Sequence, residues 1–113
     1  MIHHMNLNNE PFQLIKNKIK TIEIRLYDEK RKKLKVGDKI NFENRETQEH
    51  LSTEIINLSI YKDFKTLYSK YSKESLGYLP NEEADPNDME KYYSKEEQQK
   101  YGVVAIEIKV LEN

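Results

Sequence analysis

The sequence predicts a small mixed or barrel-like α+β fold. Segments with apolar residues at alternate positions, typical of strands, are separated by short segments with helical spacing. The links between them are hairpin-like and do not form regular β-α-β units, which argues against a doubly wound sheet. A chain of 113 residues is also long enough for one modest core. We therefore expect a single domain over residues 1–113.

The charge distribution along the chain is polarised. Hydrophobic and charged residues make up 36% and 35% of the chain, and the formal net charge is −1. Residues 16–39 nevertheless carry ten Lys or Arg against four acids, whereas residues 40–113 carry nine bases against fifteen acids. Such a basic segment can present a positive face to a polyanion. The alternative is an ordinary solvated surface in a charge-rich protein.

Several classes of protein are excluded by composition. No apolar stretch approaches the roughly 20 residues of a membrane-spanning helix, and the N-terminus lacks the apolar region of a secretory signal, so we expect a cytoplasmic protein. The absence of cysteine excludes disulfides and thiolate chemistry. The histidines His3, His4 and His50 lack metal-ligand spacing, so we expect neither a metal nor a cofactor.

The first elements are a short edge strand and a helix. Met5 and Leu7 alternate with polar neighbours, and Asn9 is a plausible N-cap. Pro11 then falls in the first helical turn, where its missing N–H costs nothing. We expect the helix to end near residue 17 or 18 and to bury one apolar stripe made of Phe12, Ile15 and Ile19.

From residue 20 the apolar period changes from 3.6 to 2, which predicts strands. In the first of these strands, residues 22, 24 and 26 point one way and residues 21, 23, 25 and 27 the other. A basic connection over 28–35 and a turn at 36–38 precede a second strand, and residues 45–50 form a hairpin loop. The following strand is expected to alternate Ile56, Leu58 and Ile60.

The C-terminal half contains three helix starts and a last strand. Asp63 is expected to cap a helix that buries Phe64 and Leu67. Residues 72–88 are expected to form a long surface loop, within which Asp85 and Pro86 start a helical turn. Ser94 and Glu97 have the spacing of a capping box. The most apolar strand, expected to be central, contains Val104, Ile106, Ile108 and Val110.

The strand over residues 20–27 carries the candidate site. Lys20, Glu23 and Arg25 place a cation, an anion and a second cation within one side-chain reach. Arg25 offers a planar fork for phosphate or a base edge, Lys20 a mobile charge, and Glu23 an acceptor for an exocyclic amine. The candidates for base stacking are Tyr27, Tyr78, Tyr92, Tyr93 and Tyr101. The alternative is a solvent-facing strand with an ordinary ion pair.

The segment Lys18-Ile19-Lys20-Thr21-Ile22-Glu23-Ile24-Arg25, with Val36-Gly37-Asp38 after it, resembles the signature G-x-K-x-x-E-x-R of the ASCH domain family, a relative of the PUA domains. The glycine is replaced by Lys18, and we expect Asn17 to adopt the left-handed conformation in its place. The resemblance covers nearly the whole chain, with small bacterial single-domain members in particular. It implies a PUA-like β pseudo-barrel with short flanking helices and a cleft associated with RNA.

The leading hypothesis is an RNA- or nucleotide-binding ASCH domain. The strand residues would recognise the ligand, and the basic segment would contact phosphates. This hypothesis implies an RNA or nucleotide-like partner and no membrane. The ligand-binding candidates are Lys20, Glu23, Arg25, Tyr27, Arg31, Lys33 and Tyr92.

Two alternatives stay open, and with them the question of whether the protein is an enzyme. By the same resemblance, some small ASCH relatives are similar to amidohydrolases that deacetylate N-acetylated cytidine with a lysine, a threonine three residues later and a remote glutamate. Lys20 matches the lysine, but Glu23 occupies the threonine position and would serve as proton carrier. The remote acid would come from Glu82, Glu83, Asp85 and Asp88. The second alternative is a protein-interaction module that uses the acidic loop 82–90.

Overall fold

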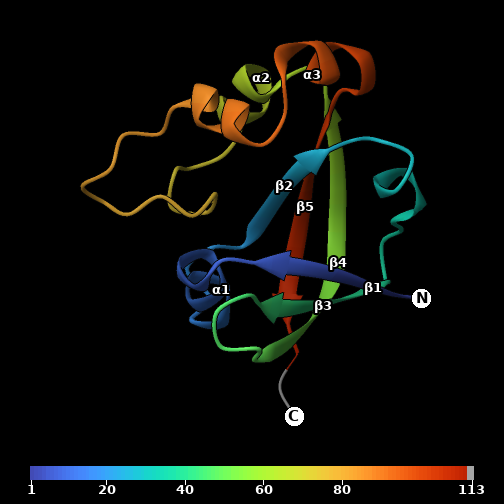
Figure 1. Ribbon diagram of the computed structural model, residues 1–113, viewed down its shortest axis with the longest axis vertical. Helices are drawn as coiled ribbons and strands as arrows, with labels where there is room; N and C mark the ends of the chain where they lie inside the picture. The colour runs from blue at the N-terminus through green and yellow to red at the C-terminus, as the bar shows by residue number, and fades with distance from the viewer. Residues whose placement is uncertain (112–113) are drawn as a thin grey trace.

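The computed structural model describes residues 1–111 and forms one five-stranded sheet in the order β1-β3-β4-β5-β2 (Figure 1). The strands are β1 (Ile2–Leu7), β2 (Ile22–Leu26), β3 (Lys39–Asn44), β4 (His50–Tyr61) and β5 (Val103–Val110). The helices are α1 (Asn9–Lys16), α2 (Phe64–Tyr68) and α3 (Lys95–Tyr101), with 3₁₀ helices η1 (Arg31–Lys33) and η2 (Pro86–Lys91). No helix within residues 1–111 is long and apolar enough to cross a membrane.

The sheet curls into a half-barrel. β1 pairs with β3 in parallel, and all other pairs are antiparallel. β4 has two pairing partners along its length, because residues 50–54 pair with β3 and residues 53–61 pair with β5. Figure 1 shows β1 and β3 crossing the long axis of β4 and β5. The curl brings the two edge strands together, since Arg25 on β2 donates to the carbonyl oxygen of Asn6 on β1 at 3.3 Å. The predicted α+β half-barrel is confirmed.

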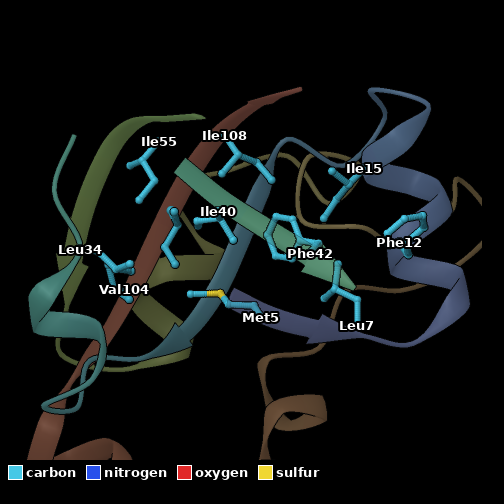
Figure 2. Close-up of a cluster of buried hydrophobic side chains, with 11 residues drawn as sticks. Met5, Leu7, Phe12, Ile15, Leu34, Ile40, Phe42, Ile55, Val104 and Ile108 are labelled. Atoms are coloured by element: carbon cyan, nitrogen blue, oxygen red, sulfur yellow. The ribbon is translucent and has the colours of Figure 1, made fainter. Parts of the chain in front are cut away.

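Two hydrophobic clusters cover the two faces of β5. The first lies within the curl of the sheet and includes residues of α1, β1, β3, β4 and β5 (Figure 2). The second lies on the other face, between β2 and the segments that follow β4. Val104 and Ile106 belong to the first cluster, whereas Val103 and Ala105 belong to the second. β5 is therefore buried on both faces, as its apolar sequence predicts.

The face predicted for β4 is wrong in part. Ile56 is 49% exposed and Ile60 is 56% exposed, whereas Ile55 is fully buried. A β-bulge between Ile55 and Asn57 shifts the register, so Ile55 takes the core position and Ile56 turns outward. Ile60 lies beyond Glu54, the last residue that pairs with β3, and so lacks the cover of that strand.

The boundaries of α1 also differ from the expectation. Asn8 occupies the N-cap position, so Asn9 is the first helical residue. Phe12 and Ile15 are buried as predicted, but the helix ends at Lys16, and Ile19 beyond it is 49% exposed. The prediction that Asn17 adopts the left-handed conformation is also wrong.

The residue that adopts the left-handed conformation is Lys18, with φ of 64°. Asn17 instead has φ of −85°, and its backbone N–H donates to the carbonyl oxygen of Gln13, while that of Lys18 donates to the carbonyl oxygen of Ile15. The chain thus turns at the position where the family signature has glycine, even though a lysine stands there.

The predicted helix starts in the second half are confirmed. Asp63 accepts a hydrogen bond from the backbone N–H of Thr66 at the start of α2. Asp85 caps η2 through Asn87, and Ser94 with Glu97 forms the reciprocal capping box of α3. These caps fix the ends of the segments that fold over β2.

Candidate functional site: a buried Lys-Glu-Arg triad

Lys20 lies just before β2 and is almost completely buried, with 6% of its surface exposed. Its Nζ donates to the carbonyl oxygen of Leu76 at 2.8 Å and lies 3.3 Å from Oε1 of Glu23. The ammonium group thus has both a neutral and a charged acceptor. These contacts satisfy the buried charge, which would otherwise be costly to remove from water.

Glu23 is the centre of the triad and is 5% exposed. Its Oε2 accepts from Nε of Arg25 at 2.7 Å and lies 2.7 Å from Nη2 of the same guanidinium. Burial alone would raise the pKa of the Glu23 carboxyl group, but the positive charges and hydrogen bonds of Arg25 and Lys20 together hold this pKa below its ordinary value. Glu23 is therefore a carboxylate at neutral pH.

Arg25 is the member of the triad that reaches the surface, with 14% of its side chain exposed. Burial would lower the pKa of its guanidinium, but the Glu23 carboxylate and, to a smaller extent, the Tyr93 hydroxyl hold it above its ordinary value. Tyr93 itself stacks on Phe64 of α2, with ring centroids 6.2 Å apart. Arg25 thus connects the buried charges to an aromatic side chain.

A segment that we call the strap, residues 72–79, closes over the start of β2. The carbonyl oxygen of Ser75 accepts the backbone N–H groups of Thr21 and Ile22, both at 3.0 Å. Gly77 has φ of 103°, and a Cβ placed there would lie 2.9 Å from Cδ of Lys20. Glycine is therefore required both by the backbone conformation and by the close approach of the lysine.

Tyrosine hydroxyl groups fasten the strap to its surroundings. The hydroxyl groups of Tyr68 on α2 and Tyr78 in the strap lie 3.0 Å apart, and Tyr78 donates to Oδ2 of Asp88 at 2.7 Å. Burial, followed by these two neighbours, raises the pKa of Tyr78 far above its ordinary value. Tyr78 therefore stays a protonated donor that links α2 to η2.

The structure brings Lys20, Glu23 and Arg25 into contact, whereas the other candidates have contacts of their own. Tyr27 packs against the first cluster, and its ring centroid lies 5.9 Å from Nζ of Lys32. Arg31 forms an ion pair with Asp28 at 2.8 Å. These contacts belong to the loop after β2, where Lys33 is exposed, while Tyr92 is 64% exposed after η2.

Sequence reasoning did not select Gly77 or Leu76 as site residues, and it named Tyr93 only as one of five tyrosines available for base stacking. Tyr93 is adjacent to Tyr92, and alternation gave no basis for choosing between them in an irregular segment. The role of Gly77 follows from its contact with a lysine far away in the sequence. A glycine in a long polar loop is a signal for a special backbone conformation, but it does not identify the partner.

Three of the four candidate acids have local roles. Glu82 accepts from the backbone N–H of Leu79 at 2.6 Å, Asp85 caps η2, and Asp88 accepts from Tyr78. Glu83 is exposed. The hydrogen bonds of the first three thus organise the loop itself, so the choice of a remote acid among them stays open.

No group of three or more His, Cys, Asp or Glu side chains with metal-binding geometry occurs within residues 1–111. His3 is instead 2.8 Å from Oδ2 of Asp38, and Nε2 of His50 is 3.3 Å from Oε1 of Glu43. The chemistry available at the triad is that of a desolvated, net positive cluster. Such a cluster can hold an anion or hydrogen-bond a planar polar group.

These features, a curled five-stranded half-barrel with short helices and a charged triad at its edge strand, define a small α+β protein of PUA-like architecture. A sequence model of the ASCH domain matches residues 5–112. The chain belongs to the ASCH domain family. No curated protein matches it.

Solved structures agree with this assignment. The chain is similar to the hypothetical protein PH0355, with 37% identity and a TM-score of 0.85 over 98% of this chain and 100% of that one. It is also similar to protein PF0455 from Pyrococcus furiosus, with 37% identity and a TM-score of 0.77 over the full length of both. The S128A mutant of ZmASCH from Zymomonas mobilis, at 16% identity, shares the fold with a TM-score of 0.69 over 96% of this chain and 67% of that one.

Proposed function

We propose that this ASCH domain binds RNA or a nucleotide-like ligand, with Arg25 as the contact between the ligand and the triad. The observation that carries the proposal is a network of three charged side chains, of which Lys20 and Glu23 are buried. Arg25 is the one member of this triad that is partly exposed to solvent. Buried ion networks are a weak means of stabilising a fold, because desolvation offsets much of the Coulomb attraction. Charged groups held in such an environment are instead typical of functional sites.

Two neighbouring features support a nucleotide-like ligand. Tyr93 lies beside Arg25, and Tyr92, which precedes it in the sequence, is exposed and can offer its ring to a base. The loop that follows β2 supplies five basic residues between positions 30 and 35. In this arrangement the basic loop contacts phosphates and the Arg25 region contacts a base or sugar.

Binding of fluorescently labelled single-stranded RNA oligonucleotides and of nucleoside phosphates, measured by anisotropy, tests the proposal. Arg25→Ala is expected to lower affinity by roughly tenfold or more. Arg45→Ala is the matched control, because Arg45 is exposed in the hairpin loop between β3 and β4 and should bind normally. Arg25→Lys keeps the positive charge but loses the planar fork, so it should bind more weakly than the native protein.

Each variant is first checked by circular dichroism and urea unfolding, so that loss of binding is not confused with loss of the fold. If native protein and Arg25→Ala bind every oligonucleotide and nucleotide equally, or if neither binds any, the proposal is wrong. Equal loss in Arg25→Ala and Arg45→Ala would indicate only nonspecific charge attraction and would also contradict it.

The contacts of Lys20 argue against the amidohydrolase alternative. Its ammonium group is buried and donates to the Leu76 carbonyl beside the Glu23 carboxylate, so a nucleophilic amine would have to leave both partners. Incubation with N-acetylated cytidine, followed by chromatography of the product, separates the two functions. Turnover by the native protein that Lys20→Ala abolishes would replace the binding proposal with a hydrolase.

A further inference from the structure

β1 is the edge strand at one end of the sheet, and within residues 1–111 its pairing partner is β3 alone (Figure 1). No other helix or strand of these residues packs extensively along it. Close to its C-terminal end, Arg25 of β2 donates to the carbonyl oxygen of Asn6 at 3.3 Å. This contact covers the end of the strand, whereas residues 2–4 have a strand on one side only.

The backbone groups of β1 alternate between β3 and this free edge. The carbonyl oxygen of Met1 accepts the N–H of Lys39 at 3.0 Å, which places the odd-numbered residues of β1 on the β3 side. Because successive residues of a strand direct their N–H and C=O groups to opposite sides, those of Ile2 and His4 point away from β3. No described residue bonds to these outward groups. They can therefore pair with a further strand.

β1 lacks the features that usually keep an edge strand from pairing. Its sequence, Ile-His-His-Met-Asn-Leu, contains neither a proline nor a lysine, arginine or carboxylate, although 35% of the chain is charged. Its register with β3 continues over all six residues without a bulge. Charges, prolines and bulges are the means by which natural edge strands avoid one another. Ile2 is 59% exposed and His4 is exposed as well, so the edge is accessible.

A second, antiparallel copy of β1 is complementary to this edge. A two-fold axis at His3 places the outward N–H and C=O groups of Ile2 opposite those of His4 of the partner subunit, so each group gains a hydrogen-bond partner. An isologous contact sets a surface against itself, and a charged strand would therefore repel its own copy. β1 carries no formal charge at neutral pH, so this cost is absent.

The charges nearest to this edge do not oppose the pairing. On the exposed face they belong to β3, where Lys39 lies beside Ile2 and Glu43 lies beside Asn6. In the paired arrangement each β3 is three strand spacings, about 14 Å, from its counterpart, which exceeds the Debye length of about 8 Å. His3 is already held by Asp38 of its own chain at 2.8 Å, so the axis brings no unpaired carboxylate into the contact.

We propose that the free edge of β1 is the interface of a homodimer, in which β1 pairs antiparallel with β1 of a second copy and the two sheets become continuous. The main-chain groups of Ile2 and His4 supply the hydrogen bonds, and the exposed side chain of Ile2 supplies apolar contact. Because the paired segment is short, the dimer is expected to be reversible. Arg25 keeps its contact with Asn6 beyond this segment, so the dimer is independent of the function proposed above.

Sedimentation equilibrium of the full chain, from micromolar to millimolar concentration, is expected to show a monomer–dimer equilibrium. His4→Pro tests its origin. The N–H of His4 points away from β3, so a proline there leaves the ladder with β3 intact, as edge strands tolerate. It removes a donor from the free edge, and its ring obstructs a second strand, so the dissociation constant should rise at least roughly tenfold. His4→Ala, the matched control, keeps the N–H and should dimerise like the native protein.

Amide hydrogen exchange locates the interface without any substitution. As the concentration rises, the amides of Ile2 and His4 should become at least roughly tenfold better protected, whereas those of His3 and Met5, which face β3 in both states, should not change. A chain that stays monomeric at every concentration would overturn the proposal. Dimerisation that His4→Pro leaves unchanged, or protection that develops at another strand instead, would show that the copies meet elsewhere and would also overturn it.

Discussion

At the scale of single residues, Glu23 determines whether the triad is stable. Its carboxylate balances two buried cations, one at 3.3 Å and the other at 2.7 Å. Removal of one member of a buried ion network leaves the others without compensation, and this costs more than the network itself contributes. The same carboxylate orients the guanidinium of Arg25, so its loss should affect both stability and binding.

Glu23→Gln is expected to lower the free energy of unfolding by about 3 kcal/mol, since the amide keeps the shape but leaves Lys20 and Arg25 buried without a counter-charge. Urea unfolding at neutral pH measures the effect. Glu29→Gln is the control, because Glu29 is 83% exposed in its pair with Lys32. Its effect should stay below about 1 kcal/mol. Equal effects of the two substitutions would contradict the role given to Glu23.

The pH dependence of stability gives a second check on Glu23. Its pKa in the folded protein is lowered, so its stabilising effect is fully present above its unfolded-state pKa of about 4.3 and is lost as the pH falls through the folded-state pKa. The difference in unfolding free energy between the native protein and Glu23→Gln should therefore be constant near neutrality and shrink in acid. A difference that grew as the pH fell would be inconsistent with the lowered pKa.

Gly77 provides a test of the contact between the strap and Lys20. Gly77→Ala and Gly37→Ala both place a Cβ at positive φ, but only at Gly77 does this atom meet Lys20, whereas Gly37 faces open space. Each substitution should cost about 1 kcal/mol for the backbone strain. Gly77→Ala should cost at least about 1 kcal/mol more, measured by thermal and urea unfolding. Equal losses of stability in the two variants would mean that the Lys20 side chain can move away from the added Cβ without cost.

Part of the site could be predicted from single residues, and part could not. The alternation in β2 correctly places Glu23 and Arg25 on one face, because strand periodicity fixes that geometry. It does not say whether the face is covered. The cover comes from Leu76 and Tyr93, which are far away in sequence. Burial of the triad, and hence its energetics, therefore depends on tertiary contacts that no local pattern contains.

At the scale of elements, the segment between β4 and β5 is held by capped helices and tyrosine contacts. The caps were predictable, because each depends on a side chain that accepts a backbone N–H two or three residues later in the sequence. The bulge in β4 was not, since one extra residue in a strand leaves the apolar content unchanged while it shifts the buried face. The end of α1 at Lys16 lies close to the expected residue 17 or 18, but the predicted burial of Ile19 is wrong. Ile19 continues the apolar spacing although the helix has already ended.

Tyr78→Phe is expected to loosen the strap. The substitution removes the hydroxyl that lies 3.0 Å from Tyr68 and donates to Asp88 at 2.7 Å, but it keeps the ring. Loss of these bonds should reduce protection against amide hydrogen exchange in residues 73–93, corresponding to about 1–2 kcal/mol. Tyr92→Phe, at an exposed position, should leave the exchange unchanged. Uniform loss of protection across the sheet would instead indicate global destabilisation.

At the scale of the whole molecule, the division of charge can be tested by salt. Substitution of Lys30, Lys32 and Lys33 by Gln is expected to lower the slope of log affinity for RNA against log salt by about 2 to 3, since each phosphate contact contributes about 0.7 to 0.9. A matched triple substitution of Lys62, Lys65 and Lys70 around α2 serves as control. Equal reductions in slope would show that the phosphate contacts are not confined to the loop after β2.

The fold class and the number of strands could be predicted from the sequence, whereas the order of the strands could not. Periodicity identifies each strand but not its neighbour. The pairing of β1 with β3 in parallel, and of β2 with β5, depends on contacts between distant segments. The free edge of β1 follows from the strand order, which becomes visible only when the strands are aligned.

The pairing of β2 with β5 also has a consequence for the order of folding during synthesis. β2 leaves the ribosome early, but the strand that it pairs with is the fifth and last of the sheet. Until β5 has been made, β2 has no strand to pair with, so Glu23 and Arg25 are not held in a sheet. Pairing of β2 with β5 also closes a long loop, which has an entropic cost. A nascent chain that stops short of Val103 is therefore expected to hold β2 as an exposed, unpaired segment, which chaperones and proteases recognise.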